Sequence, residues 1–330
     1  MHLPKFEHIQ ASSMEEAAHL LNENGLKAQL VAGGTDLYLR MKYGLIRPER
    51  IISLKGIPVK PPAIDDTGDL HIDPLTTLAD LARSAPIIER APLIAEAALS
   101  VGSNQVRHMG TLGGNLCLEN RCPYYNQTHS FQFMEPCFKR NGERCYLIPE
   151  GKKCWAIFSA DTVPALISLG ALITVTGPEK SRQIALERLY TGDALKPLAI
   201  AHTEILTKII VPAPPPLKGY AFLKFSLRGG MEFAILNVAV FLDMADETHC
   251  RGARITVGGL SASPVRIVKA EEALTGEVLS KGLFHEVALM AASEAHPFPN
   301  HSISSGYLRE CLRVQTLRAL TLASTRVHGD

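Results

Sequence analysis

A glycine-rich turn followed by a cysteine-rich segment, between residues 110 and 161, constrains this chain more than any other feature. The turn reads Gly-Thr-Leu-Gly-Gly-Asn-Leu over residues 110–116. The segment after it holds five of the seven cysteines: Cys117, Cys122, Cys137, Cys145 and Cys154. Glycines let a backbone approach a phosphate closely, and grouped cysteines bind metals. We therefore expect a phosphorylated cofactor beside a metal centre, a combination typical of electron transfer.

Composition narrows the class of protein. A chain of 330 residues with 46% hydrophobic and 20% charged residues is an ordinary globular protein, long enough for more than one domain. Its net charge of +1 gives no electrostatic reason to expect nucleic acid or an anionic membrane as a partner. No secretory signal is visible, and the longest apolar stretch, residues 163–175, is too short to cross a bilayer. We expect a cytoplasmic protein with reduced cysteines, where a cysteine group indicates metal binding or catalysis.

Four of the cysteines are the candidate metal ligands: Cys122, Cys137, Cys145 and Cys154. Their spacing is too wide for a zinc finger or ribbon, and it lacks the C-x2-C-x2-C run of bacterial ferredoxins. Four thiolates bind either a structural zinc or a 4Fe-4S cluster, so the spacing leaves both open. Cys117 lies on the glycine side of this group, and we expect it to pack beside the cofactor.

The segment around these cysteines is also rich in aromatic and basic residues. The aromatic residues would shield a metal centre, or simply form a small core of their own. Six Lys and Arg residues against four Glu could attract an acidic electron carrier, or could form an ordinary solvated surface. The aromatic residues are Tyr124, Tyr125, Phe131, Phe133, Phe138, Tyr146, Trp155 and Phe158.

A second glycine turn occurs earlier in the chain. An apolar strand over residues 29–32 runs into Gly33-Gly34-Thr35-Asp36-Leu37. A strand, a glycine turn and a helix in this order expose backbone N–H groups to an anion, although two glycines also suit a plain tight turn. Because Asp36 repels phosphate, the backbone N–H groups and the Thr35 hydroxyl would have to bind it. Two such turns could hold a dinucleotide from opposite sides, without a Rossmann or Walker motif.

The domain organisation follows from turns and prolines. We expect a first cofactor-binding subdomain over residues 1–56 and a second over 57–214, with residues 118–159 inserted in it. The proline-rich run 212–216 is a stiff linker, and a third, α+β domain would occupy 217–330. Helices are expected over 11–24, 268–274, 283–295 and 306–324. Neither H-E-x-x-H nor G-x-S-x-G occurs, so we predict no catalytic residue.

Taken together, residues 31–37, 105–116, 161–166 and 224–228 resemble, in order, the FAD-binding subunit of the molybdenum hydroxylases, the xanthine dehydrogenase and carbon monoxide dehydrogenase family. The resemblance implies a two-subdomain FAD-binding (PCMH-type) domain followed by a C-terminal α+β domain of the carbon monoxide dehydrogenase flavoprotein type. It also implies a large subunit with the molybdenum cofactor and a small subunit with 2Fe-2S clusters, as a dimer of heterotrimers.

The cysteine-bearing insertion resembles the 4-hydroxybenzoyl-CoA reductase branch of that family, since most other members have a much shorter connection there. This implies a 4Fe-4S cluster on the four candidate cysteines, a ferredoxin-like electron donor, and reductive removal of a para-hydroxyl group by the partner subunits. Two alternatives stay open. The chain could serve a molybdenum hydroxylase that acts on a purine or N-heterocycle, or the cysteines could form a structural zinc module for subunit docking.

The resemblance also implies individual FAD contacts. Asp161 would lie at the flavin, Ile200 near the isoalloxazine ring and Lys224 at its polar edge. The full set is Leu30, Val31, Ala32, Gly33, Gly34, Thr35, Asp36, Leu37, Val101, Thr111, Gly113, Gly114, Asn115, Cys117, Asp161, Ile200 and Lys224.

Overall fold

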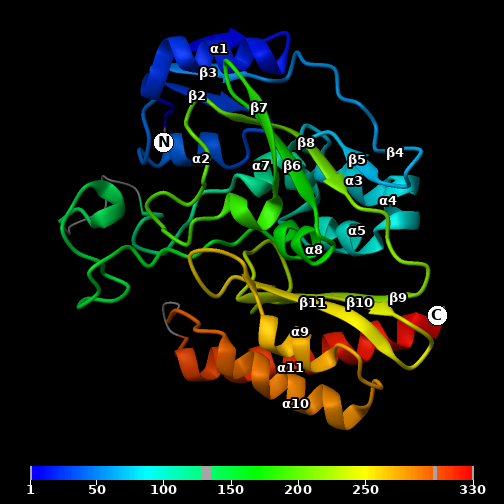
Figure 1. Ribbon diagram of the computed structural model, residues 1–330. Helices are drawn as coiled ribbons and strands as arrows, with labels where there is room; N and C mark the ends of the chain where they lie inside the picture. The colour runs from blue at the N-terminus through cyan, green and yellow to red at the C-terminus, as the bar shows by residue number, and fades with distance from the viewer. Residues whose placement is uncertain (1, 128–134, 300–302, 329–330) are drawn as a thin grey trace.

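The computed structural model describes residues 2–127, 135–299 and 303–328, and these form three parts, each built on a β-sheet. In Figure 1 the N-terminal part lies at the top, the second part in the middle and the C-terminal part at the bottom. The green segment that projects to the left is the cysteine-rich insertion. This mixed helix and sheet architecture confirms the predicted α+β class.

The N-terminal part is a small parallel sheet in the order β1-β3-β2. Its helix α1 starts where the Ser13 hydroxyl accepts a hydrogen bond from the Glu16 N–H, and it buries Ala17, Ala18 and Leu21. Strand β2 ends at Val31, directly before the first glycine turn. The elements are β1 (Glu7–Gln10), α1 (Met14–Asn24), η1 (Gly25–Lys27), β2 (Ala28–Val31), α2 (Leu37–Lys42) and β3 (Arg50–Ser53).

The second part is an antiparallel sheet in the order β4-β5-β8-β6-β7, packed against short helices. Its strands are β4 (Ala63–Ile64), β5 (Leu70–Ile72), β6 (Leu172–Thr176), β7 (Ser181–Ala185) and β8 (Ile205–Val211). Its helices are α3 (Leu78–Arg83), α4 (Ala85–Arg90), α5 (Pro92–Leu99), α6 (Asn104–Met109), α7 (Leu112–Leu116), α8 (Thr162–Ser168) and η4 (Leu186–Leu189). The insertion leaves this part between α7 and α8.

The C-terminal part is an antiparallel sheet in the order β12-β11-β10-β9, with three helices on one face (Figure 1). Its strands are β9 (Lys218–Phe225), β10 (Leu236–Met244), β11 (Cys250–Gly258) and β12 (Val265–Arg266), and its helices are α9 (Val268–Leu274), α10 (Lys281–Glu294), α11 (Ser305–Thr325) and η5 (Arg326–His328). The other face meets α8, where the Ser168 hydroxyl donates to the Ala239 carbonyl at 3.2 Å. The C-terminal part therefore closes on the second part.

The insertion has a defined neck. Arg121 and Ile157 exchange two backbone hydrogen bonds of 2.9 Å, which join its two ends as an antiparallel bridge. Nearby, the buried Asn120 amide donates to the carbonyls of Ala156 and Ala262, so the neck is also attached to the C-terminal part. Within the described part of the insertion the one named helix is η3 (Phe138–Arg140).

The aromatic residues of the insertion do not act as one shield, so that expectation was wrong in part. Phe158 packs in the core of the second part, 4.8 Å from the ring of Tyr190, and Trp155 packs on Phe298 at 4.5 Å. Phe158 is thus drawn into the main body, whereas Phe298, the partner of Trp155, packs against the small cluster that includes Cys154. Phe131 and Phe133 lie outside the described residues.

Candidate functional site

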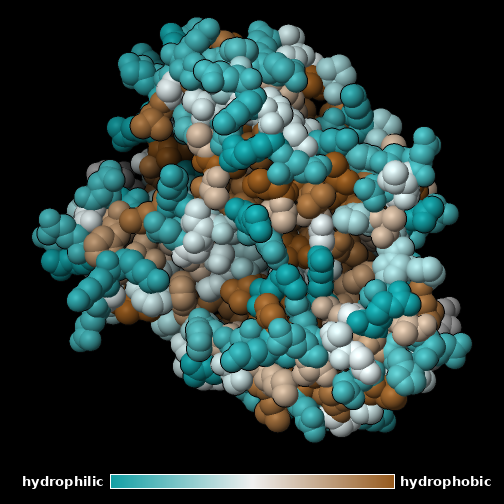
Figure 2. All heavy atoms as spheres, viewed as in Figure 1, coloured by the Kyte–Doolittle hydropathy of each residue, from teal (hydrophilic) through white to brown (hydrophobic). Residues whose placement is uncertain are grey.

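A cavity of about 780 Å³ is lined by residues of all three parts. Most of them come from 29–40, 74–78, 101–121, 159–161, 198–206 and 228–233. Figure 2 shows hydrophobic side chains gathered across the middle of the molecule, between more hydrophilic surfaces at the top and bottom. The cavity is in the size range of small-molecule and cofactor sites.

The two glycine segments touch each other at this cavity. A Cβ atom on Gly33 would lie 1.9 Å from the Met109 carbonyl oxygen and 2.9 Å from the Gly110 Cα. Gly34 adopts a φ of +72°, which favours glycine. The absence of a side chain at Gly33 therefore lets the turn after β2 approach the backbone at the end of α6, so that the two segments form one wall.

The second glycine segment is partly helical, which corrects the prediction of a turn over residues 110–116. Helix α7 begins at Leu112, and the Thr111 hydroxyl caps it by accepting from the Gly114 N–H at 3.1 Å. Asn115 Oδ1 accepts from the Thr162 hydroxyl at 2.6 Å and so holds the start of α8. The Thr111 and Asn115 side chains thus support the cavity wall through contacts within the protein.

Two arginines that sequence reasoning missed also line the cavity, namely Arg40 and Arg121. Both pair with Asp36, Arg40 at 3.8 Å and Arg121 in a shorter contact. The Nε atoms of both arginines are buried without a hydrogen-bond partner in the described structure. The i, i+4 spacing of Asp36 and Arg40 was a usable signal, whereas the Arg121 pair depends on the fold. Asp36 is therefore neutralised, which removes the expected repulsion of phosphate.

Asp161 lines the cavity, and its carboxylate accepts hydrogen bonds from two residues that do not line it. Lys224 Nζ donates to Asp161 Oδ2 at 2.7 Å, and Asn237 Nδ2 donates to Asp161 Oδ1 at 3.0 Å. Lys224 Nζ also donates to the carbonyls of Ser100 and Glu232, at 2.8 and 3.0 Å. Burial raises the pKa of Asp161, while the Lys224 ammonium opposes that shift.

Every residue predicted to contact the cofactor lines this cavity except Lys224. Lys224 lies on β9 with its ammonium occupied by the three partners just described, so the fold gives it the role of positioning Asp161. Cys117 lines the cavity, in agreement with the prediction that it packs beside the cofactor. Burial raises the pKa of its thiol to about 12. This thiol therefore stays protonated and unreactive near neutral pH.

The four candidate ligands line a second, much smaller cavity in the insertion, and Cys117 does not. The Tyr125 N–H donates to Cys122 Sγ at 3.3 Å, and burial raises the pKa of Cys122 to about 11. Among the described residues, no three His, Cys, Asp or Glu side chains are placed to hold one metal ion. The residues around this cavity are Cys122, Tyr124, Cys137, Phe138, Lys139, Arg144, Cys145, Tyr146, Leu147, Cys154 and Ala156.

The insertion presents less positive charge than its sequence indicated. Arg121 pairs with Asp36, Lys139 pairs with Glu119 at 2.7 Å, and Arg140 donates to the carbonyl of Tyr125 at 3.2 Å. Lys139 and Arg140 therefore make contacts within the insertion, and Arg121 joins it to the N-terminal part. Arg144, Lys152 and Lys153 are the exposed ones. A solvated surface thus accounts for only half of the basic residues.

Comparison with known proteins assigns the two domain types. Residues 4–214 match the family described as "FAD binding domain in molybdopterin dehydrogenase", and residues 221–323 match "CO dehydrogenase flavoprotein C-terminal domain". No helix in the described part of the chain has the length and apolar character needed to cross a membrane.

Several relatives match over nearly the whole chain. The carbon monoxide dehydrogenase medium chain of Afipia carboxidovorans is 27% identical, and the alignment covers 97% of each chain. The 6-hydroxypseudooxynicotine dehydrogenase complex subunit alpha of Paenarthrobacter nicotinovorans is 26% identical over 98% of this chain and 96% of its own. The crystal structure of a Cu,Mo-CO dehydrogenase matches with a TM-score of 0.82 and 26% identity, over 99% of this chain and 100% of that one.

Proposed function

We propose that this chain, which belongs to the family of FAD-binding domains in molybdopterin dehydrogenases, carries FAD in the large cavity and a 4Fe-4S cluster in the insertion. Its role would be to pass electrons between a donor and partner subunits. Relatives named as medium chains or complex subunits support a multi-subunit assembly. We propose partners that carry the molybdenum cofactor and 2Fe-2S clusters, as a dimer of heterotrimers.

One observation carries the FAD assignment, namely that both glycine segments form a wall of a single cavity of sufficient size. Backbone N–H groups around Gly33 and Gly34 would approach the pyrophosphate, and Arg40 and Arg121 would add positive charge beside it. Asp161 would orient the flavin from its fixed position. When bound, FAD supplies one- and two-electron redox chemistry, and the protein supplies position and electrostatics.

The insertion offers a four-thiol donor set, because four cysteines line one small cavity. Four thiolates suit either a zinc ion or a 4Fe-4S cluster, in which each iron takes one thiolate. The resemblance of the insertion to the 4-hydroxybenzoyl-CoA reductase branch is the reason that we propose the cluster. The donor set is Cys122, Cys137, Cys145 and Cys154.

The specific reaction we propose is that of 4-hydroxybenzoyl-CoA reductase, with reduced ferredoxin as donor and loss of the para-hydroxyl on the large subunit. The cysteine-bearing insertion supports this choice. A molybdenum hydroxylase that acts on a purine or N-heterocycle, with electrons flowing outward, fits the same FAD site. Turnover by the complete complex separates the two: reduction of 4-hydroxybenzoyl-CoA supports the first, and oxidation of a purine with no such reduction supports the second.

Metal analysis of the anaerobically purified protein tests the cluster. We expect about four irons with acid-labile sulfide in each chain, and a Cys137→Ser variant that loses this iron while FAD still binds, since Cys137 does not line the large cavity. Cys311→Ser is the control, because Cys311 packs against the core of the C-terminal part, and it should keep all the iron. About one zinc without iron would contradict the cluster and support the docking module.

A further inference from the structure

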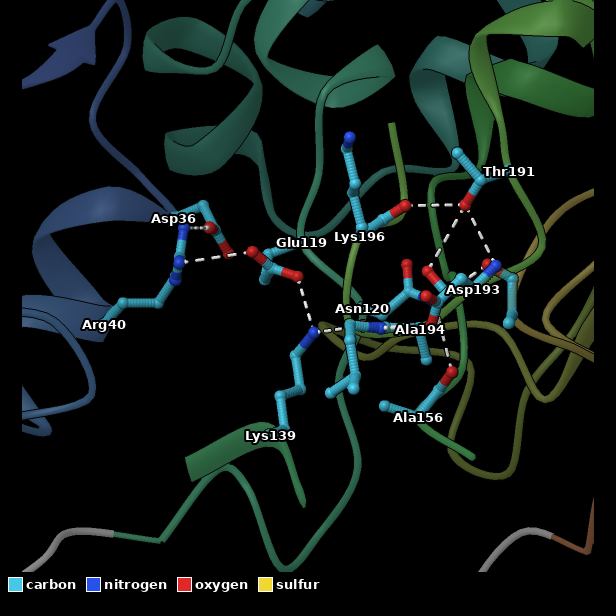
Figure 3. A network of polar contacts seen from close by, with 12 residues as sticks. Asp36, Arg40, Glu119, Asn120, Lys139, Ala156, Thr191, Asp193, Ala194 and Lys196 are labelled. Carbon is cyan, nitrogen blue, oxygen red and sulfur yellow. Dashed lines mark hydrogen bonds and ion pairs between the residues drawn. The ribbon is translucent and has the colours of Figure 1, made fainter. Parts of the chain in front are cut away.

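A chain of ion pairs connects the two cavities. Arg40, on the wall of the large cavity, pairs with Glu119 at 3.3 Å, and Glu119 pairs with Lys139 at 2.7 Å. Lys139 lies on η3 and lines the cysteine cavity. Figure 3 shows Asp36, Arg40, Glu119 and Lys139 in sequence, with dashed lines from each to the next. Glu119 is thus the shared partner of one cation from each cavity.

These charges are largely removed from solvent. The side chains of Lys139, Arg40 and Glu119 are 7%, 15% and 21% exposed. Lys139 also donates to the Ala194 carbonyl and lies 5.4 Å from the centre of the Tyr125 ring. Pairs this sheltered are weakly screened, and removing one member leaves a poorly hydrated charge behind. The position of Glu119 therefore depends on its ion pairs with both Arg40 and Lys139.

We propose that Glu119 and Lys139 are positioning residues that couple FAD binding to the position of η3 beside the cysteine cavity. The inference rests on the proposed binding of FAD in the large cavity. The phosphates of FAD would order the Arg40 guanidinium, Arg40 holds Glu119, and Glu119 holds η3 through Lys139. The segments joined in this way are α2, the neck of the insertion and η3.

Coupling between two sites is reciprocal. FAD should make the cysteine segment open less often, and loosening the segment at Lys139 should weaken FAD binding. Lys139 does not line the large cavity, so a direct contact with FAD does not explain such an effect. A purely local structural role for Lys139 predicts neither result.

The test measures FAD affinity and thiol exposure in the full-length chain. Flavin fluorescence gives the FAD dissociation constant of the wild type, Lys139→Met, Glu119→Gln and the double variant. Alkylation by iodoacetamide with a metal chelator present, with and without saturating FAD, gives the opening rate at each of the four cysteines. Lys152→Met is the matched control, because Lys152 is an exposed lysine of the insertion and lines neither cavity.

We expect Lys139→Met to weaken FAD binding at least about fivefold, the lower end of usual coupling. In the Glu119→Gln background the same change should have less than about a twofold effect, because Lys139 has already lost its charged partner. FAD should slow alkylation several-fold in the wild type and in Lys152→Met, but not in Lys139→Met.

Equal FAD affinity of Lys139→Met and wild type, or alkylation of the wild type that ignores FAD, would overturn the coupling. If a variant does not fold, alkylation of the wild type that ignores FAD still overturns the coupling. A wild type that binds no FAD would instead refute the proposed function.

Discussion

Replacing Lys224 with Met is expected to lower the free energy of unfolding by about 3–5 kcal/mol, the usual cost of removing one partner from a buried ion pair. Lys224 is 11% exposed and Asp161 only 3%, and the substitution leaves the Asp161 carboxylate with Asn237 alone. The same lysine connects β9 to the Ser100 carbonyl in the second part, so the contact between the two parts weakens as well. Urea unfolding followed by circular dichroism measures the change.

The loss in Lys224→Met should be larger at pH 8 than at pH 5. Burial already raises the pKa of Asp161 above its ordinary 3.8, and without the Lys224 ammonium the pKa rises further. The folded state then holds a proton that the unfolded state releases above about pH 4, so its stability falls as the pH rises toward the folded pKa.

Two variants control this result. Lys208→Met removes a lysine from the exposed side of β8 and should change the stability by less than about 0.5 kcal/mol. Adding Asp161→Asn to Lys224→Met removes the unpaired carboxylate and should restore part of the loss, with no remaining pH dependence from this pair. If Lys224→Met loses the same free energy of unfolding at pH 5 and at pH 8, then the Asp161 carboxylate is not the cause of the loss.

The second large effect is expected for Gly33→Ala. The added methyl group would lie 1.9 Å from the Met109 carbonyl oxygen, which belongs to the backbone and has no rotamer to change. We expect a cost of about 1–3 kcal/mol from overpacking. Because the two glycine segments must move apart, FAD affinity should fall by at least about tenfold, as titration with flavin fluorescence would show.

Gly252→Ala is the matched control, since no atom lies within 4 Å of the added methyl group and the backbone there needs no positive φ. It should bind FAD like the wild type. If Gly33→Ala also keeps wild-type affinity, then the contact between the two glycine segments does not define the FAD site.

Much of the fold could be predicted because its signals are local. Alternating or helical apolar patterns and caps placed α1, α9, α10 and α11 within a few residues, and the comparisons confirm the two domain types. The predicted boundaries at residues 56 and 214 stay predictions. The short helix α7 was missed, since glycines over residues 113–114 read as a loop until the Thr111 cap is seen in place.

The roles of the charged residues could not be predicted in this way, because they depend on partners far away in the chain. Arg121, read as part of the basic surface of the insertion, pairs with Asp36 across 85 positions. Lys224, expected to contact the flavin, holds Asp161 across 63. No periodicity or spacing records such pairs, because they form only when the fold brings separate segments together.

The sequence by itself determined that this chain has two glycine segments able to approach a phosphate. It also separated the four candidate metal ligands from Cys117, which lies on the glycine side. Backbone freedom and thiol chemistry are properties of the residue types themselves, so the sequence alone indicates them. Only the tertiary structure decided that the two glycine segments meet at one wall, that Arg121 pairs with Asp36, and that Glu119 connects both cavities. These are contacts between distant residues, and contacts exist only in the folded chain.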